Sequence, residues 1–138
     1  MPAALLLGAS RGLGLEFAKQ CLGDGWTVYA THRTEADRVR LRDLGAQTLK
    51  LDVLDGDDLA GLAWQLEGER IDLAVVNAGV YGPRNSSLQQ PPATGDFDLV
   101  MRTNVLGPMR LLPRLAPLLG PARGTRAFMT SRMGSISA

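Results

Sequence analysis

Residues 5–17 read LLLGASRGLGLEF, and this stretch decides the fold. A run of leucines leads directly into glycines at positions 8, 12 and 14, after which apolar residues recur with helical spacing. Glycine in the interior of a helix or strand costs roughly 0.5–1 kcal/mol relative to alanine, so this clustering needs a physical reason. The pattern predicts a tight turn from a buried strand into a helix, at which another group approaches the backbone closely.

The composition is that of one globular domain covering residues 1–138. Fifteen basic and 14 acidic residues give a net charge of +1, so we expect neither nucleic acid nor a membrane surface as a partner. Cys21 is the single cysteine and cannot form an internal disulfide, which favours a cytoplasmic location. No apolar run is long enough to span a bilayer, and no metal site is predicted.

Short apolar runs alternate along the chain with segments of helical periodicity. We expect strands at residues 4–7, 26–31, 48–53, 71–77 and 126–130. The longest helix is expected over residues 97–119, where Pro113 and Pro117 should kink or shorten it. Strict alternation of strand and helix predicts right-handed βαβ units, and therefore an α/β fold with a doubly wound parallel sheet of five strands.

The glycine turn is the predicted ligand site, because ligands of doubly wound sheets bind beyond the carboxyl ends of the strands. Gly8 would end the first strand and Gly14 would open the first helix, whose N-terminal amides attract anions. A valine at position 14 should then block a bound phosphate while leaving the sheet able to form. The alternative is a tight strand–helix turn with no ligand, since a glycine pattern by itself is weak.

Other motifs follow the sequence GASRGLG of residues 8–14 in a fixed order. They are LDV at 51–53, NAG at 77–79, TNVLGPMRL at 103–111 and TSRMGSI at 130–136. On these residues the whole chain resembles the short-chain dehydrogenase/reductase family, and NAGVYGP with SRMGSI is most similar to its C-factor, carbonyl-reductase-like branch. The resemblance implies a Rossmann-like domain and a nicotinamide-dependent oxidoreductase that acts on a small-molecule carbonyl or alcohol.

The resemblance also implies which residues bind the cofactor. The residues that would wrap the pyrophosphate are Gly8, Ser10, Arg11, Gly12, Leu13 and Gly14. Asp52 and Val53 would flank the adenine, with Asp52 accepting a hydrogen bond from its amino group. Asn77, Ala78 and Gly79 would line the floor of the cofactor site. For Asn77, a structural amide that bridges strands is an equally good interpretation.

The residues after the second strand favour NADP(H) over NAD(H). An NAD enzyme usually places a carboxylate there to accept from the ribose hydroxyls, whereas this chain has Thr31, His32 and Arg33. Arg33 and Arg11 could together bind a 2′-phosphate through their planar guanidinium groups. The alternative is two solvated surface arginines. We expect His32 to be an ordinary surface histidine.

Two residues match catalytic positions of the family. The resemblance implies that Ser131 polarises the substrate carbonyl, and that Asn104 distorts the long helix and holds a water in a proton relay. Asn104 lies on the apolar face of that helix, so it must find hydrogen-bond partners. A structural amide bonded to neighbouring backbone is therefore the alternative for Asn104.

The Tyr-x-x-x-Lys pair that supplies the proton in the family is absent from these residues. Tyr29 and Tyr81 are followed four positions later by Arg33 and Asn85. We therefore expect a family member that is truncated before this pair. Two function classes stay open. The first is an NADP(H)-dependent oxidoreductase. The second is a non-catalytic nucleotide-binding or interaction module, or an inactive fragment. The helix over 97–119 is the expected surface for a homo-oligomer.

Overall fold

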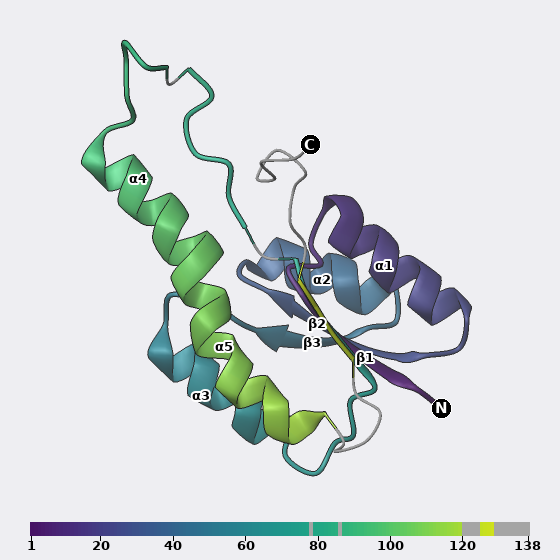
Figure 1. The fold of residues 1–138 in the computed structure, drawn as a ribbon. Helices are drawn as coiled ribbons and strands as arrows, with labels where there is room; N and C mark the ends of the chain where they lie inside the picture. The colour runs from purple at the N-terminus through teal and green to yellow at the C-terminus, as the bar shows by residue number, and fades with distance from the viewer. Residues whose placement is uncertain (78, 86, 120–124, 129–138) are drawn as a thin grey trace.

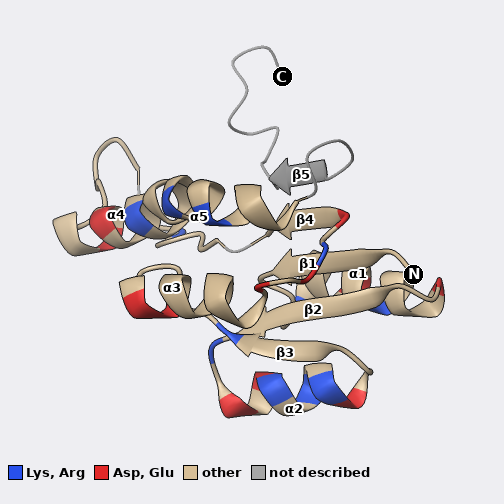
Figure 2. Ribbon diagram, turned by 90° about the horizontal axis from the view of Figure 1, so that it is seen from below, with Lys and Arg blue, Asp and Glu red and all other residues tan. Residues whose placement is uncertain are grey.

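The computed structural model describes residues 1–77, 79–85, 87–119 and 125–128. Five parallel strands form one sheet in the order β3-β2-β1-β4-β5 (Figure 2), with helices in the connections between them. The strands are β1 (Ala3–Leu7), β2 (Thr27–His32), β3 (Gln47–Lys50), β4 (Leu73–Val76) and β5 (Thr125–Phe128). The α-helices are α1 (Gly12–Gly23), α2 (Glu35–Asp43), α3 (Gly56–Gln65), α4 (Thr94–Met101) and α5 (Gly107–Leu115). The predicted doubly wound parallel sheet is confirmed.

Helices cover both faces of the sheet (Figure 1), and an apolar layer on each face packs against them. In β1, Leu5 and Leu7 belong to the core that α3 and α5 cover. Leu6 belongs to the opposite core, which α1 and α2 cover. Successive residues of a strand point to opposite faces, so a central strand must be apolar throughout, as β1 is. This explains why the leucine run precedes the glycines without a polar interruption.

The strands differ from the predicted ranges mainly at their ends. β3 ends at Lys50, before the predicted end at residue 53, because the chain turns at Asp52. The Asp52 carboxylate accepts a hydrogen bond of 2.9 Å from the backbone N–H of Leu54, which closes a local turn. β4 is likewise shorter than predicted at both ends, and β5 begins at Thr125 rather than at residue 126. Residues 129 and 130 of the predicted fifth strand lie outside the described residues.

The predicted long helix changes its hydrogen-bond pattern before either proline, and its α-helical part ends at Leu115, so it is shortened near Pro117 as predicted. Between α4 and α5, a π-helical segment η1 (Arg102–Leu106) replaces the α-helical pattern. The N–H of Gly107 donates to the carbonyl of Arg102, five residues earlier. Pro113 lies inside α5 on its exposed side, where water can bond the carbonyl that proline leaves unpaired. A short 3₁₀ turn, η2 (Ala116–Leu118), follows α5.

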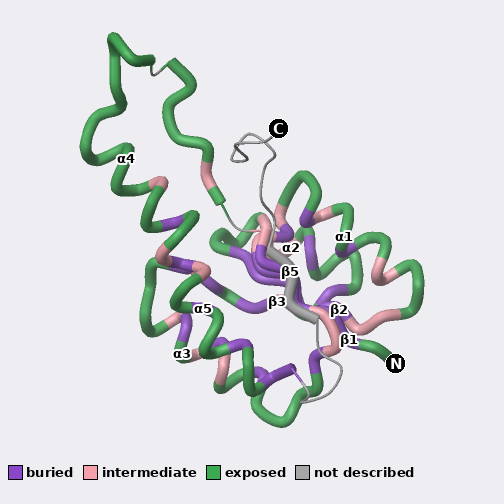
Figure 3. The backbone as a smooth tube through the Cα atoms, viewed as in Figure 1, coloured by how far each residue is buried: buried purple, intermediate pink, exposed green. Residues whose placement is uncertain are grey.

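α4 is the most exposed helix of the described chain. It contains no buried residue and extends beyond the sheet together with the preceding loop (Figures 1 and 3). By contrast, α5 returns to the sheet and buries Leu111 and Leu115. Within the described residues, no helix combines the length and apolar character needed to cross a membrane.

Candidate functional site

The glycine turn lies at the carboxyl end of β1, where the order of the strands reverses: β2 and β3 follow on one side of β1, and β4 and β5 on the other. This is the position at which open α/β sheets bind ligands. Gly8 and Gly12 have φ angles of 93° and 58°, in the region that side chains disfavour. The backbone path of the turn therefore requires glycine at both positions.

Two neighbouring strands hold the peptide groups of Gly8 from opposite sides. The backbone N–H of Gly8 donates to the Thr31 hydroxyl at the end of β2, at 3.1 Å. The side-chain amide of Asn77, directly after β4, donates to the Gly8 carbonyl, also at 3.1 Å. Asn77 thus bridges strands, as one of the two interpretations of its sequence position predicted. The turn is fixed before any ligand binds.

Gly14 is required by the protein itself. A β-carbon at this position would lie 2.1 Å from the Gly8 carbonyl oxygen and 2.8 Å from the side-chain nitrogen of Asn77. The start of α1 therefore packs directly on the Gly8 peptide, and only a residue without a β-carbon permits so close an approach. A valine at position 14 would therefore meet the turn itself as well as any ligand, a contact that the sequence-based prediction did not include.

The first turn of α1 has no side-chain cap. Arg11 occupies the N-cap position in an extended conformation. Its guanidinium has no hydrogen-bond acceptor, so it does not cap the N–H groups of the first turn. In contrast, Thr34 caps α2, and Asp55 caps α3. The first N–H groups of a helix have no partner inside the helix, and they carry the positive end of its dipole. Among the described residues, the start of α1 thus offers donors for an anion at the glycine turn.

The other residues of the loop are open to solvent or held by α2. Arg11, Gly12 and Leu13 are exposed, and Ser10 is half-buried. The guanidinium of Arg40, on α2, donates to the Ser10 carbonyl at 2.8 Å. No sequence motif points to Arg40, because only the tertiary fold brings it to a loop 30 residues earlier.

The end of β2 carries a buried histidine beside an exposed arginine. His32 is 8% exposed, so the prediction of a surface histidine is wrong. Its Nδ1 atom is buried and has no hydrogen-bond partner among the described residues. Arg33 is exposed. The hydrogen bond from Arg38 engages the Glu35 carboxylate and holds its pKa below the ordinary value.

Asp52 and Val53 lie in different environments although they are adjacent. Asp52 is half-buried; its backbone N–H donates to the Asp58 carboxylate at 2.9 Å. Val53 is 7% exposed and belongs to the core beneath α5. A β-carbon on Gly107 would lie 3.0 Å from a methyl carbon of Val53, so glycine lets the helix approach here. The Val53 side chain therefore packs against α5 at Gly107.

Asn104 lies in the middle of the π-helical segment and holds the loop after β4. Its side chain accepts from the N–H of Val80 and donates to the carbonyl of Val80, both at 2.8 Å. Its partner is thus a distant loop, and not the neighbouring backbone that the structural alternative assumed. A β-carbon on Gly79 would lie 3.1 Å from the Asn104 side-chain oxygen, which explains the glycine there. Ala78 and Ser131 lie outside the described residues.

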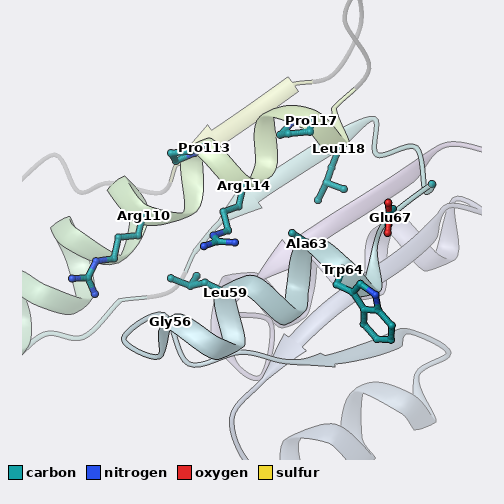
Figure 4. Close-up of a pocket in the computed structure, with 11 residues that line it drawn as sticks. Gly56, Leu59, Ala63, Trp64, Glu67, Arg110, Pro113, Arg114, Pro117 and Leu118 are labelled. Atoms are coloured by element: carbon teal, nitrogen blue, oxygen red, sulfur yellow. The ribbon is translucent and has the colours of Figure 1, made fainter.

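A groove of about 840 Å³ lies between α3 and α5 (Figure 4). Leu59 and Ala63 of α3 face Pro113 and Arg114 of α5 across it, and Trp64 lies at its rim. None of the residues that line this groove belongs to the glycine turn. It is therefore a separate feature of the surface.

The strand order and the glycine turn after the first strand define a Rossmann-like domain. Residues 2–137 match the family described as short chain dehydrogenase. The chain belongs to this family, as the sequence motifs predicted.

The relatives include enzymes that are considerably longer. The human 17-beta-hydroxysteroid dehydrogenase type 1 is 28% identical over 146 residues, which cover 96% of this chain and 43% of that protein. A solved short-chain dehydrogenase/reductase from Burkholderia multivorans with bound NADP is 37% identical, with a TM-score of 0.89, over 99% of this chain and 61% of that one. A carbonyl reductase from Pseudomonas aeruginosa PAO1 in complex with NADP is 31% identical, with a TM-score of 0.86, and the match covers 99% of this chain and 64% of that one. The chain thus spans less than two thirds of the length of these relatives.

Proposed function

We propose that this chain binds a nicotinamide dinucleotide at the glycine turn, with the pyrophosphate over the start of α1. The observation that carries the proposal is the Gly8 backbone held by Thr31 and Asn77 in front of a helix start without a side-chain cap. Fixed backbone donors at a helix N-terminus bind phosphate without first having to be ordered. Gly12, Leu13 and the other residues of the loop would wrap the pyrophosphate, as the family resemblance implies.

NADP(H) is the cofactor that the charges near β2 favour over NAD(H). Arg33 and Arg11 are exposed, and their planar guanidinium groups could each donate two hydrogen bonds to the doubly charged 2′-phosphate. Glu35 is the first carboxylate after β2, and the bond from Arg38 already engages it. Two related structures contain NADP, which supports the same preference.

The remaining cofactor contacts follow from the strand ends. Asp52 would accept from the adenine amino group, and Val53 would contribute its backbone, because its side chain is in the core. Asn77, Ala78 and Gly79 would form the floor under the nicotinamide side, with Asn77 also keeping its bond to Gly8.

A reducing compartment such as the cytoplasm fits the lone Cys21.

The chemistry we propose is oxidation or reduction of a small alcohol or carbonyl compound, with Ser131 polarising the carbonyl. Asn104 would act by holding the loop at Val80 and by offering the altered helix backbone to a water. These 138 residues contain no Tyr-x-x-x-Lys pair to supply the proton. A nucleotide-binding module without turnover is therefore the second candidate for the chain as it stands.

A titration of the purified chain with NADPH and NADH tests the binding proposal. We expect tighter binding of NADPH, and we expect Arg33→Ala to remove most of this preference while leaving NADH binding nearly unchanged. Arg84→Ala is the control, since Arg84 is exposed in the loop after β4 and lies over the ring of Tyr81. Equal affinities for both cofactors in the unaltered chain would contradict the preference, and binding of neither would contradict the site.

The exposed side of the long helix supports a proposal of self-association. Exposed apolar side chains follow one another at intervals of three or four residues along α4, η1 and α5, namely Phe97, Met101, Val105, Met109 and Leu112. α4 contains no buried residue, and a continuous row of exposed apolar side chains is typical of a surface that another surface covers. We propose a second copy of the chain. Met109→Glu should then shift the sedimentation coefficient to that of the monomer, whereas Arg70→Glu should not.

A further inference from the structure

A side chain of α2 reaches across to the glycine turn. Arg40 lies on α2, and its terminal nitrogen donates to the backbone carbonyl of Ser10 at 2.8 Å. The same guanidinium lies 3.8 Å from the carboxylate of Asp37, one turn earlier on the helix. The other N–H groups of the Arg40 guanidinium are available to solvent, since the side chain is 53% exposed.

The bonded carbonyl belongs to the peptide that leads into α1. Ser10 precedes Arg11, which is the N-cap residue of α1. In a trans peptide the C=O and the following N–H point in opposite directions, and the described chain contains no cis peptide. A carbonyl held toward α2 therefore directs the N–H of Arg11 away from α2. One contact from α2 thus fixes the orientation of the last peptide before the helix.

Arg40 differs in this respect from the other arginines of its helix. Arg38 bonds Glu35, and Arg42 bonds Asp43, so both act within α2. Among the described residues, Arg40 makes the only side-chain hydrogen bond from α2 to the glycine turn. Asp37 lies on the side of Arg40 toward the helix start, where it can restrict the rotamers of the arginine.

We propose that Arg40 is a positioning residue for dinucleotide binding, because it sets the Ser10–Arg11 peptide in the orientation that receives the pyrophosphate. This inference rests on the proposed function of the glycine turn. The pyrophosphate is common to NADPH and NADH, so Arg40 contributes equally to the affinity for both. This distinguishes Arg40 from Arg33, whose contribution is to the 2′-phosphate alone.

The test compares the dissociation constants of NADPH and NADH for the unaltered chain, Arg40→Ala, Arg40→Lys and Arg42→Ala. Loss of a hydrogen bond from a charged group corresponds to roughly a tenfold weakening, so Arg40→Ala should weaken both cofactors about tenfold and leave their ratio unchanged. Arg40→Lys should restore part of the affinity, because an ammonium group can still donate to the carbonyl. Arg42→Ala is the matched control, at 55% side-chain exposure on the same helix.

The melting temperature separates positioning from a general loss of stability. Arg40→Ala and Arg42→Ala should melt alike, while only the former loses cofactor affinity. Unchanged affinities in Arg40→Ala would overturn the inference, as would a loss confined to NADPH, which would indicate direct contact with the 2′-phosphate. If Arg40→Ala does not fold, Arg40→Lys alone decides. Weaker binding of both cofactors by Arg40→Lys than by the unaltered chain supports the inference, and unchanged binding of both overturns it. Failure of the unaltered chain to bind either cofactor would refute the proposed function itself.

Discussion

The side-chain amide of Asn104 pairs with both backbone polar groups of Val80, with two hydrogen bonds of 2.8 Å each. The amide thereby replaces the backbone partner that a neighbouring strand would provide. The contact joins the π-helical segment between α4 and α5 to the loop that follows the proposed cofactor floor at residues 77–79. Asn104 therefore connects the helix directly to the loop beside the predicted site.

Replacement of Asn104 by alanine should destabilise the chain by about 1–2 kcal/mol, because two hydrogen bonds are lost and partly replaced by water. Urea unfolding followed by circular dichroism measures this free energy. Asn85→Ala, in the exposed loop before α4, is the control and should leave the free energy of unfolding nearly unchanged. An equal effect of both variants would show that the paired bonds contribute nothing.

Two glycines of α1 should respond in opposite ways to alanine. At Gly14 the new β-carbon meets the Gly8 carbonyl oxygen, so Gly14→Ala should lower the free energy of unfolding by about 3 kcal/mol. At Gly23 nothing lies within 4 Å, and Gly23→Ala should raise it by about 0.5–1 kcal/mol. Thermal and urea unfolding of the two variants check this. A stable, well-folded Gly14→Ala chain would contradict the close packing of α1 on the turn.

Tyr29 should make the fold sensitive to alkaline pH. Burial raises the pKa of Tyr29 above its ordinary value, and the nearby Glu69 carboxylate raises it further. The neutral phenol is favoured in the folded chain, so its contribution to stability is complete below about pH 10, the pKa of an unfolded tyrosine, and is lost as the pH rises toward the folded pKa. The free energy of unfolding, measured from about pH 8 to about pH 11, should fall less steeply in Tyr29→Phe. Tyr81→Phe should follow the unaltered chain, because Tyr81 is 84% exposed.

The 138-residue chain should show no carbonyl reduction above background with NADPH. A serine hydroxyl is a poor acid at neutral pH, and general acid–base groups typically contribute about 10²–10⁴-fold to the rate. Loss of NADPH absorbance with a panel of aldehydes and ketones measures the rate. Fusion to a family segment that carries Tyr-x-x-x-Lys should produce activity, and Ser131→Ala should then remove it. Turnover by the unextended chain that survives Ser131→Ala would show that other residues carry the chemistry.

Local sequence patterns predicted the sheet because they report on burial directly. A run such as Leu5–Leu7 can only be a buried segment, and the glycines after it can only be a turn. One of the two interpretations of Asn77, an amide that bridges strands, is confirmed by its bond to Gly8. By contrast, the burial of His32 depends on how α2 covers the end of β2, and no local pattern contains that information. The contacts of Asn104 with Val80 and of Arg40 with Ser10 span 24 and 30 residues, so they too become visible only in the folded chain.

The bond between Asn77 and Gly8 has a consequence for the order of folding. The two residues are separated by 69 positions, and the same separation joins Asp72 to the N–H of Ala3 at the other end of the strand pair. Closing a loop of this length costs entropy before its contacts repay it, so β1 and β4 should pair late. A nascent chain that has emerged only through α3 would contain every glycine of the turn and still lack its final shape. During synthesis, the capacity to bind a dinucleotide should therefore arise abruptly, when β4 docks, and not gradually as the glycine loop appears.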